Sequence, residues 1–265
     1  MTSLAKKSAL LVGAALLTSL AACGSSTDSD AGESTDTLTI GTSGTFRPIT
    51  YSEGGELTGF DIAVGNEIAE RIGRETDFVE GQLAGLIPGL DSGQFDAVMS
   101  GLTETDERKA AVLFSEAYHA DGTVAVVAKG EDTTTDVTEL GGLRVGAISG
   151  SGTESDVETI GGYESYTGYP GAPEGIADLA AGRIDLFATT RVAAQAYIDT
   201  AADGDTLTIV GDTYHLLPVG IALSKDSGEG LKDEIDGAIA EMKDDGTLAE
   251  LQEQWLGFVP EIPEQ

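Results

Sequence analysis

Small hydroxyl residues and glycines follow the segments that the sequence predicts to be strands. Those at the predicted strand ends are Ser43, Ser100, Gly101, Ser149, Ser151 and Thr189. Hydroxyl groups and backbone amides can hydrogen-bond a polar small molecule. In mostly parallel sheets, ligands bind beyond the carboxyl ends of the strands. The pattern therefore predicts a polar binding site where these strand ends meet.

Hydrophobic periodicity indicates the elements that must position these residues. Residues 37–40 alternate polar and apolar side chains before Gly41, which is typical of a strand. Apolar residues recur every fourth position from Phe60 to Ile72, and Gly73 follows, so we expect an amphipathic helix there. Residues 84–92 predict a second helix that opens near Pro88, followed by a turn and a strand. Alternation of strands and helices favours mostly parallel sheets.

The C-terminal region is predicted to be helical. Two apolar stripes are separated by Gly246: first Leu231, Ile235, Ile239 and Met242, then Leu248, Leu251 and Trp255. Stripes of this kind usually face a core, and we do not interpret them as a partner-binding surface.

Two short sequence motifs each occur twice in the folded region, in the same order. Residues 38–44 are similar to residues 143–150, and residues 90–100 are similar to residues 179–189. Each motif combines strand or helix positions with a glycine turn. Two lobes of similar plan are the simplest interpretation, with their strand ends facing one another across a cleft. Chance remains the alternative, because such short phrases are common.

Composition excludes several classes of function. The chain has 265 residues, enough for one or two domains, and a formal net charge of −32. This charge argues against a nucleic-acid binder and against electrostatic adhesion to anionic lipid. One cysteine excludes a disulfide framework, and two histidines leave little for a zinc site. We expect no metal and no cofactor.

The first 22 residues form a separate segment with two lysines, no acidic residue and a short apolar run. These features predict an export signal, the alternative being a short N-terminal membrane anchor. The sequence Leu-Ala-Ala-Cys at its end resembles a bacterial lipobox, in which Cys23 is lipidated and becomes the mature N-terminus. Removing residues 1–22 deletes two positive charges, so the mature net charge is −34. Residues 24–36 are small, polar and acidic, which is typical of a flexible tether.

Nine short sequence motifs together resemble those of a known family. They are IGT at 40–42, GTFRP at 44–48, LTGFD at 57–61, GLIPGL at 85–90, FDA at 95–97, TDERK at 105–109, AGRID at 181–185, DDGTL at 244–248 and QWLG at 254–257. In this order they resemble the extracellular solute-binding proteins of polar amino acid ABC importers. The resemblance covers about residues 38–257. It implies the type II fold of periplasmic binding proteins, in which two α/β lobes joined by two hinge strands close on a ligand.

The resemblance also implies a set of ligand-binding residues. Arg108 matches the arginine that clamps the ligand carboxylate, a role that suits a planar guanidinium. Without the family, a surface arginine in an acidic helix start is the preferred interpretation. Phe46 matches an aromatic residue that covers the ligand, and a core phenylalanine is its alternative. The remaining matches are Leu83, where a second aromatic residue is common, Ser100, Gly101, Thr103, Ser151 and Gly152, with Thr153 as a register alternative.

Two positions depart from the family pattern. Amino acid binders usually place an aspartate where this chain has Thr190, to hold the α-ammonium group, and an acidic residue is common where it has Ser43. Desolvating an ammonium group without a counter-charge is costly. Three alternatives remain. The Ser43 and Thr190 hydroxyls together with Phe46 are enough to hold the ammonium group, or a nearby acid such as Asp185 replaces the missing carboxylate. In the third, the ligand is an ectoine-like solute or a modified amino acid.

Enzyme signatures are weak in this sequence. It has no G-x-S-x-G elbow, no phosphate-binding P-loop and no H-E-x-x-H motif. His119 and His215 lie near the expected hinge crossings, so we interpret them as hinge or surface residues. A small cyclic-acid dehydratase on the same fold and a surface sensor are the alternative functions.

The combined expectation is a monomeric, lipid-anchored receptor outside the cytoplasmic membrane that delivers an amino acid or similar carboxylate to an ABC permease. Lobe one comprises residues 37–119 and 220–258, and lobe two comprises residues 120–219. Residues 1–22 are the signal peptide, residues 23–36 the lipidated cysteine and tether, and residues 259–265 the tail.

Overall fold

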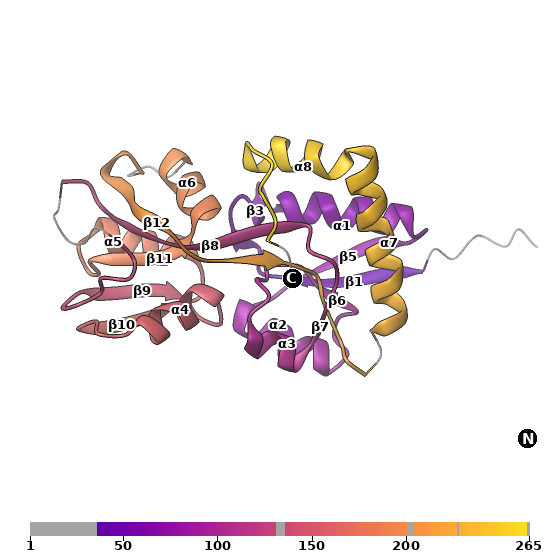
Figure 1. Ribbon diagram of the computed structural model, residues 1–265, viewed down its shortest axis with the longest axis horizontal. Coiled ribbons are helices and arrows are strands. Elements are labelled where there is room, and N and C mark those ends of the chain that lie inside the picture. Colours follow the sequence, from indigo (N-terminus) through magenta and orange to yellow (C-terminus); the bar gives the residue numbers. More distant parts are fainter. Residues whose placement is uncertain (1–35, 131–135, 201–203, 227, 264–265) are drawn as a thin grey trace, which may run out of the picture. The chain divides into compact units, whose positions relative to one another are not determined.

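The computed structural model describes residues 36–130, 136–200, 204–226 and 228–263. The predicted signal peptide, Cys23 and nearly all of the predicted tether lie outside these residues. The described chain forms two five-stranded sheets flanked by helices, together with a small three-stranded sheet (Figure 1). No helix within these ranges has the length and apolar character needed to cross a membrane.

The first sheet has the strand order β5-β1-β6-β13-β7. Its strands are β5 Glu75–Glu80, β1 Thr37–Thr42, β6 Ala97–Val98, β13 Ala222–Leu223 and β7 Leu113–Phe114. Strand β1 runs parallel to both β5 and β6, whereas β13 is antiparallel to β6 and β7. Strand β13 comes from the C-terminal part of the chain, so the chain returns to this sheet after forming the second one.

The second sheet repeats this arrangement in the order β10-β9-β11-β8-β12. Its strands are β10 Ser165–Tyr169, β9 Arg144–Ile148, β11 Leu186–Thr190, β8 His119–Ala128 and β12 Leu207–Val219. Strand β9 is parallel to β10 and β11, and β8 is antiparallel to β11 and β12. The fold class is confirmed: each sheet is mixed, because one strand, β13 in the first sheet and β8 in the second, runs against the other four.

Helices cover both faces of the first sheet, and we call the sheet with these helices the first lobe. Helices α1 Phe60–Arg71, α7 Glu229–Asp245 and α8 Thr247–Leu256 form one core with Leu38 and Ile40 of β1. Helix α2 Leu83–Asp91 forms a second core with Val98 and Ala222. Apolar side chains on both faces explain why the central strands β1, β6 and β13 are mostly buried.

The second lobe is built in the same way around the second sheet. Helices α5 Ala172–Ala180 and α6 Arg191–Thr200 pack on the face that presents Val124 and Val126 of β8. Helix α4 Gly152–Ile160 packs on the face of Ala125 and Val127. Successive residues of β8 therefore point to opposite cores, as a strand requires.

Most predicted helices are confirmed. The stripe from Phe60 belongs to α1, and Gly246, in the left-handed conformation at φ 89°, separates α7 from α8. The interpretation of Pro88 as a helix opening was wrong, because α2 begins at Leu83 and Pro88 lies inside it. Burial of Leu86 and Leu90 offsets the hydrogen bond that a proline cannot donate.

Strands β8 and β12 are the long antiparallel pair that leads from one lobe to the other (Figure 1). Val219 at the end of β12 also bridges Thr103, which belongs to the first lobe. The small sheet consists of β2 Thr45–Phe46, β3 Thr50–Glu53 and β4 Glu56–Thr58. The residue at which one lobe ends and the other begins stays a prediction.

Candidate functional site

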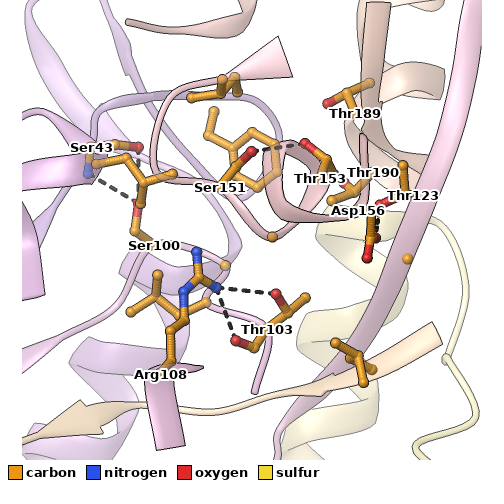
Figure 2. Close-up of a pocket in the computed structure, with 18 of the residues that line it drawn as sticks. Ser43, Ser100, Thr103, Arg108, Thr123, Ser151, Thr153, Asp156, Thr189 and Thr190 are labelled. Atoms are coloured by element: carbon orange, nitrogen blue, oxygen red, sulfur yellow. Dashed lines mark hydrogen bonds between the residues drawn. The ribbon is translucent and has the colours of Figure 1, made fainter. Parts of the chain in front are cut away.

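One pocket brings together every residue that the resemblance singled out for ligand binding (Figure 2). They are Ser43, Phe46, Leu83, Ser100, Gly101, Thr103, Arg108, Ser151, Gly152 and Thr190. Thr153, the register alternative, lines the same pocket. The residues come from both lobes, so the pocket lies between them.

The pocket forms at the carboxyl ends of parallel strands, as the strand-end pattern predicts. Ser43 follows β1 and Ser100 follows β6, and their hydroxyl oxygens are 2.9 Å apart. The Ser43 amide also donates to the Ser100 hydroxyl at 3.2 Å. In the second lobe, the loop that contains Ser151 follows β9, and Thr190 ends β11. The site is therefore lined mainly by uncharged donors and acceptors.

Arg108 supplies the positive charge of the pocket. It lies in the short helix α3 Asp106–Ala111, whose N-cap Thr105 accepts a hydrogen bond from the Arg108 amide at 3.2 Å. The residue is only 8% exposed, so the interpretation as a surface arginine was wrong. The sequence did not reveal this burial, because the neighbouring Asp106 and Glu107 are charged residues of an exposed turn.

The guanidinium of Arg108 is held by oxygens that carry no charge. Its Nη1 donates to the carbonyl of Thr103 at 2.9 Å and to the Thr103 hydroxyl at 3.1 Å. Its Nη2 donates to the carbonyl of Gly150 at 2.9 Å. Within the described residues Arg108 forms no ion pair, and burial lowers its pKa to about 10 despite the nearby Glu107. A buried cation without an anion favours binding of one.

The unused donors of Arg108 suit a carboxylate. A guanidinium has five N–H groups, and three hydrogen bonds are formed within the described chain. Two donors remain, which is the number that a bidentate carboxylate accepts.

Phe46 closes the apolar side of the pocket against Gly101. Gly101 has φ +60°, and a Cβ atom at this position would lie 2.8 Å from the Phe46 ring. The Gly101 amide donates to Asp61 Oδ2 at 2.7 Å, which holds the backbone in place. Phe46 packs against the main cores of both lobes, and Leu83 packs against the second lobe and the α2 core. Both residues therefore contact each side of the pocket.

The start of α4 forms the opposite polar wall. Ser151 is its N-cap and accepts from the Glu154 amide at 3.0 Å, while the Ser151 and Thr153 hydroxyls are 2.8 Å apart. A Cβ atom on Gly152 would lie 2.5 Å from the Thr103 hydroxyl, so a glycine permits this approach of the two lobes. The first-turn amides of a helix lack intrahelical partners and favour an anion.

Asp156 was missed in the sequence, although it is the one carboxylate among the described residues that line this pocket. Its Oδ2 accepts from the Thr123 hydroxyl at 2.5 Å, and its Oδ1 lies 2.7 Å from His215 Nδ1. Asp156 follows Gly152 by one helical turn, so the spacing could have placed both on one face of α4. The contact with His215 had no local signal, because the two residues are 59 positions apart.

Asp185 does not substitute for the absent family carboxylates. It binds Arg144, whose Nη2 and Nε lie 2.5 and 3.0 Å from its oxygens. The Arg144 guanidinium lowers the pKa of Asp185, and Asp185 is not among the pocket residues. The expectation that Asp185 could serve the ligand was therefore wrong.

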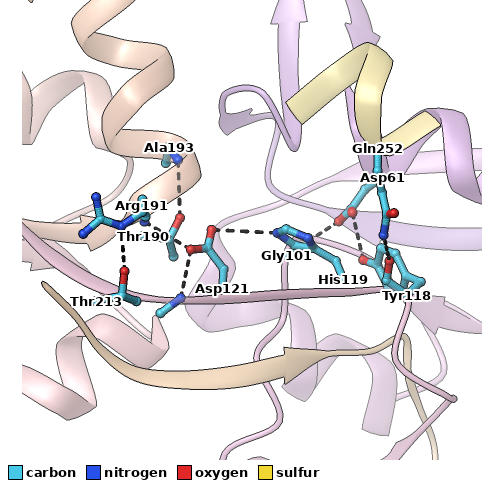
Figure 3. A network of polar contacts seen from close by, with 11 residues as sticks. Asp61, Gly101, Tyr118, His119, Asp121, Thr190, Arg191, Ala193, Thr213 and Gln252 are labelled. Atoms are coloured by element: carbon cyan, nitrogen blue, oxygen red, sulfur yellow. Dashed lines mark hydrogen bonds and ion pairs between the residues drawn. The ribbon is translucent and has the colours of Figure 1, made fainter. Parts of the chain in front are cut away.

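The two histidines occupy different environments. His215 belongs to β12, lines the pocket and has a half-exposed side chain. His119 begins β8, is 1% exposed and packs edge-on against Phe60. Figure 3 shows His119 between Asp61 and Asp121 in a line of buried polar groups along β8.

Thr190 caps the next helix rather than forming an ion pair. Its hydroxyl accepts from the Ala193 amide at 3.4 Å, and Asp121 accepts from the Arg191 amide at 3.1 Å (Figure 3). Thr190 lies opposite Thr123 in the antiparallel pairing of β11 with β8. In the described ranges, no group of three or more histidine, cysteine or acidic side chains is arranged to hold a metal ion.

Comparison with known proteins agrees with this architecture. Residues 38–258 match the family model of the bacterial extracellular solute-binding proteins, family 3. The chain is 34% identical to the L-cystine-binding protein TcyJ of Escherichia coli over 224 residues, 83% of each chain. It is 32% identical to the probable amino-acid-binding protein YxeM of Bacillus subtilis over 260 residues, 95% of each chain.

Solved structures of related proteins have the same fold. An ancestral arginine-binding protein bound to arginine superposes with a TM-score of 0.79 at 36% identity, covering 83% of this chain and 98% of the other.

Proposed function

Because the chain belongs to the bacterial extracellular solute-binding proteins, family 3, we propose that it captures an amino acid or similar carboxylate between its lobes and delivers it to an ABC permease. Two of the named relatives bind L-cystine and arginine, and the third is a probable amino-acid-binding protein, which supports an amino acid as the solute. These relatives are described as binding proteins, so the dehydratase alternative is set aside.

Arg108 is the single observation that carries this proposal. A guanidinium that is buried in the pocket and lacks an anion is complementary to the α-carboxylate shared by all amino acids. The amides at the start of α4 add donors from the second lobe. A carboxylate between these groups therefore contacts both lobes at once.

Contact of the ligand with both lobes makes the conformation of the protein depend on whether the ligand is bound. A ligand that bridges the lobes favours the conformation in which they are close together. The permease would recognise that conformation. Ser43, Ser100, Thr103, Ser151 and Thr190 serve as hydrogen-bonding residues in this proposal, with Phe46 and Leu83 as the apolar cover.

The proposal includes an anchor outside the described residues. Residues 1–22 direct export and are removed, and Cys23 carries the lipid that retains the protein at the membrane. Residues 24–36 act as the tether between lipid and folded protein. The strongly negative net charge suits a soluble body that does not adhere to anionic lipid.

A thermal-shift screen tests the proposed function. L-Arginine, L-cystine, L-glutamine, glycine betaine and ectoine are added singly to the purified protein. A true ligand at about one hundred times its Kd stabilises the native state by about 2.7 kcal/mol. Small-angle scattering with the best stabiliser should show a more compact particle, unless the unliganded protein is already closed. Absence of any shift across this panel would contradict amino acid capture.

A further inference from the structure

The Asp156 carboxylate lies inside the binding pocket and can accept further hydrogen bonds. The residue is 8% exposed and lies on the first turns of α4. One of its oxygens accepts from Thr123 and the other contacts His215. A carboxylate has about four lone-pair positions, so roughly half remain for another donor.

The position of Asp156 is tied to Thr190 through the second sheet. Thr190 pairs with Thr123 across β11 and β8, and the Thr123 hydroxyl donates to Asp156. Figure 2 shows the three side chains together on one side of the pocket, with the Arg108 guanidinium entering from another element. The pocket thus has a negative side on the second lobe and a positive group on the first.

This distribution of charge favours one class of solute. A zwitterion presents an anion to Arg108 and a cation to Asp156, so both buried charges gain partners. A carboxylate without a cationic group brings no positive charge to the buried Asp156 carboxylate, which is unfavourable. A solute with only a positive charge leaves the buried Arg108 guanidinium without an anion.

We infer that Asp156, fixed by Thr123 and His215, binds the α-ammonium group of a zwitterionic amino acid whose carboxylate binds Arg108. The inference rests on the proposed function and names the solute class: amino acids with a free ammonium group, selected over carboxylates that lack one. The negative charge comes from helix α4 rather than from position 190.

A purely structural role for Asp156 makes a different prediction. The residue joins α4 to β8 through Thr123 and to β12 through His215, so it also holds the second lobe together. Loss of that role would lower the melting temperature and would affect all solutes equally. Only a direct contact with the ammonium group makes the effect depend on that group.

Calorimetry with matched solute pairs separates these roles. The probes are L-arginine with 5-guanidinopentanoate, L-glutamine with 4-carbamoylbutanoate, and L-cystine with 3,3′-dithiodipropionate. Each pair differs by the α-ammonium groups. The full chain and Asp156→Asn are titrated at about pH 8, where imidazole groups are ordinarily neutral. Glu158→Gln is the control, because it removes the same charge from an exposed position of the same helix.

The wild-type protein should bind at least one amino acid and prefer it to its deaminated partner by about 30-fold or more, as expected for a desolvated charge pair. Asp156→Asn should lose most of this preference and Glu158→Gln should keep it. If Asp156→Asn retains the preference while wild-type protein binds the amino acid, the inference is overturned and the proposed function stands. If wild-type protein binds none of the three amino acids, the proposed function fails and the inference fails with it.

Discussion

The Nη2 atom of Arg108 lies 2.9 Å from the carbonyl oxygen of Gly150, so a cation of the first lobe hydrogen-bonds directly to a loop of the second. The same guanidinium retains two donors for a carboxylate. Binding of a solute and contact between the lobes therefore involve one side chain. This relationship gives a physical route from occupancy of the pocket to the arrangement of the lobes.

Replacing Arg108 should remove carboxylate binding. Arg108→Ala should weaken binding of the best amino acid from the thermal-shift panel by roughly 30-fold to several thousand-fold, which corresponds to about 2–5 kcal/mol for one partner of a desolvated charge pair. Calorimetry measures the change. Arg108→Lys is the control, because it keeps the charge and loses the two-donor geometry, so its affinity should be intermediate. Unchanged affinity in Arg108→Ala would refute the assignment of the site.

Tyr197 provides a second contact between the lobes that is remote from Arg108. Its hydroxyl donates to the Thr45 carbonyl at 2.9 Å and accepts from the Arg47 amide at 3.4 Å. Tyr197→Phe removes these bonds with little change in volume, so affinity for the same amino acid should fall by about 2- to 10-fold, mostly through faster dissociation. Stopped-flow kinetics measure the rate. A lowered melting temperature with unaltered dissociation would assign the hydroxyl to the fold alone.

Asp61 should make stability depend on pH. Burial raises its pKa to about 6 from 3.8, against the opposing effect of hydrogen bonds from the Gly101 amide and the Tyr118 hydroxyl (Figure 3). Between these values the unfolded chain ionises while the folded protein keeps the proton. The free energy of unfolding should therefore fall as pH rises from about 4 to 6, by roughly 3 kcal/mol from this group.

Asp61→Asn isolates this contribution, because its amide oxygen can accept from Gly101 while its amide nitrogen donates to Tyr118. Urea denaturation of both proteins at intervals between about pH 4 and 8 measures the difference. The difference in free energy of unfolding between wild type and variant should change over that window and stay constant above about pH 7. A parallel pair of curves across the whole range would show that Asp61 does not titrate as described.

Moving the negative charge to position 190 should restore the preference for amino acids over their deaminated partners that Asp156→Asn removes. In the Asp156→Asn background, Thr190→Asp places a carboxylate opposite Thr123, close to the lost one. Preference for the amino acid over its deaminated partner should return at least in part. In the wild-type background the same change sets two carboxylates near each other, and binding should weaken. Tighter binding in the wild-type background would instead indicate that the ammonium group lies at Thr190.

Cys23→Ser should release the protein from the membrane. Cys23 is the single cysteine of the chain and ends a lipobox-like segment. Without the thiol no lipid can be attached to sulfur, so the protein should move from the membrane fraction to the soluble extracytoplasmic fraction. Cell fractionation and mass spectrometry of the N-terminus follow this change. Retention of the variant in the membrane fraction after removal of the N-terminal segment would indicate a different anchor.

Local sequence patterns were sufficient to predict those features of the structure that depend on nearby residues. The apolar spacing from Phe60 to Ile72 predicts α1 because one helical face must contact the core, and Gly246 separates α7 from α8 because it adopts a left-handed conformation. The strand-end hydroxyls predict the pocket because parallel strands end at one edge. The ordered motifs then identified the family, and they singled out Arg108 as the residue that we propose to bind the carboxylate.

Tertiary structure decided the charges of the pocket. Nothing beside Arg108 in the sequence distinguishes a buried guanidinium from a surface one, because its partner Gly150 belongs to the second lobe and is 42 positions away. Asp156 resembles any acidic residue of an amphipathic helix until β12 brings His215 to it. The sequence alone determined which elements form and which family they belong to. The environment of a charge depends on residues far apart in the chain, and only the packing of the lobes brings them together.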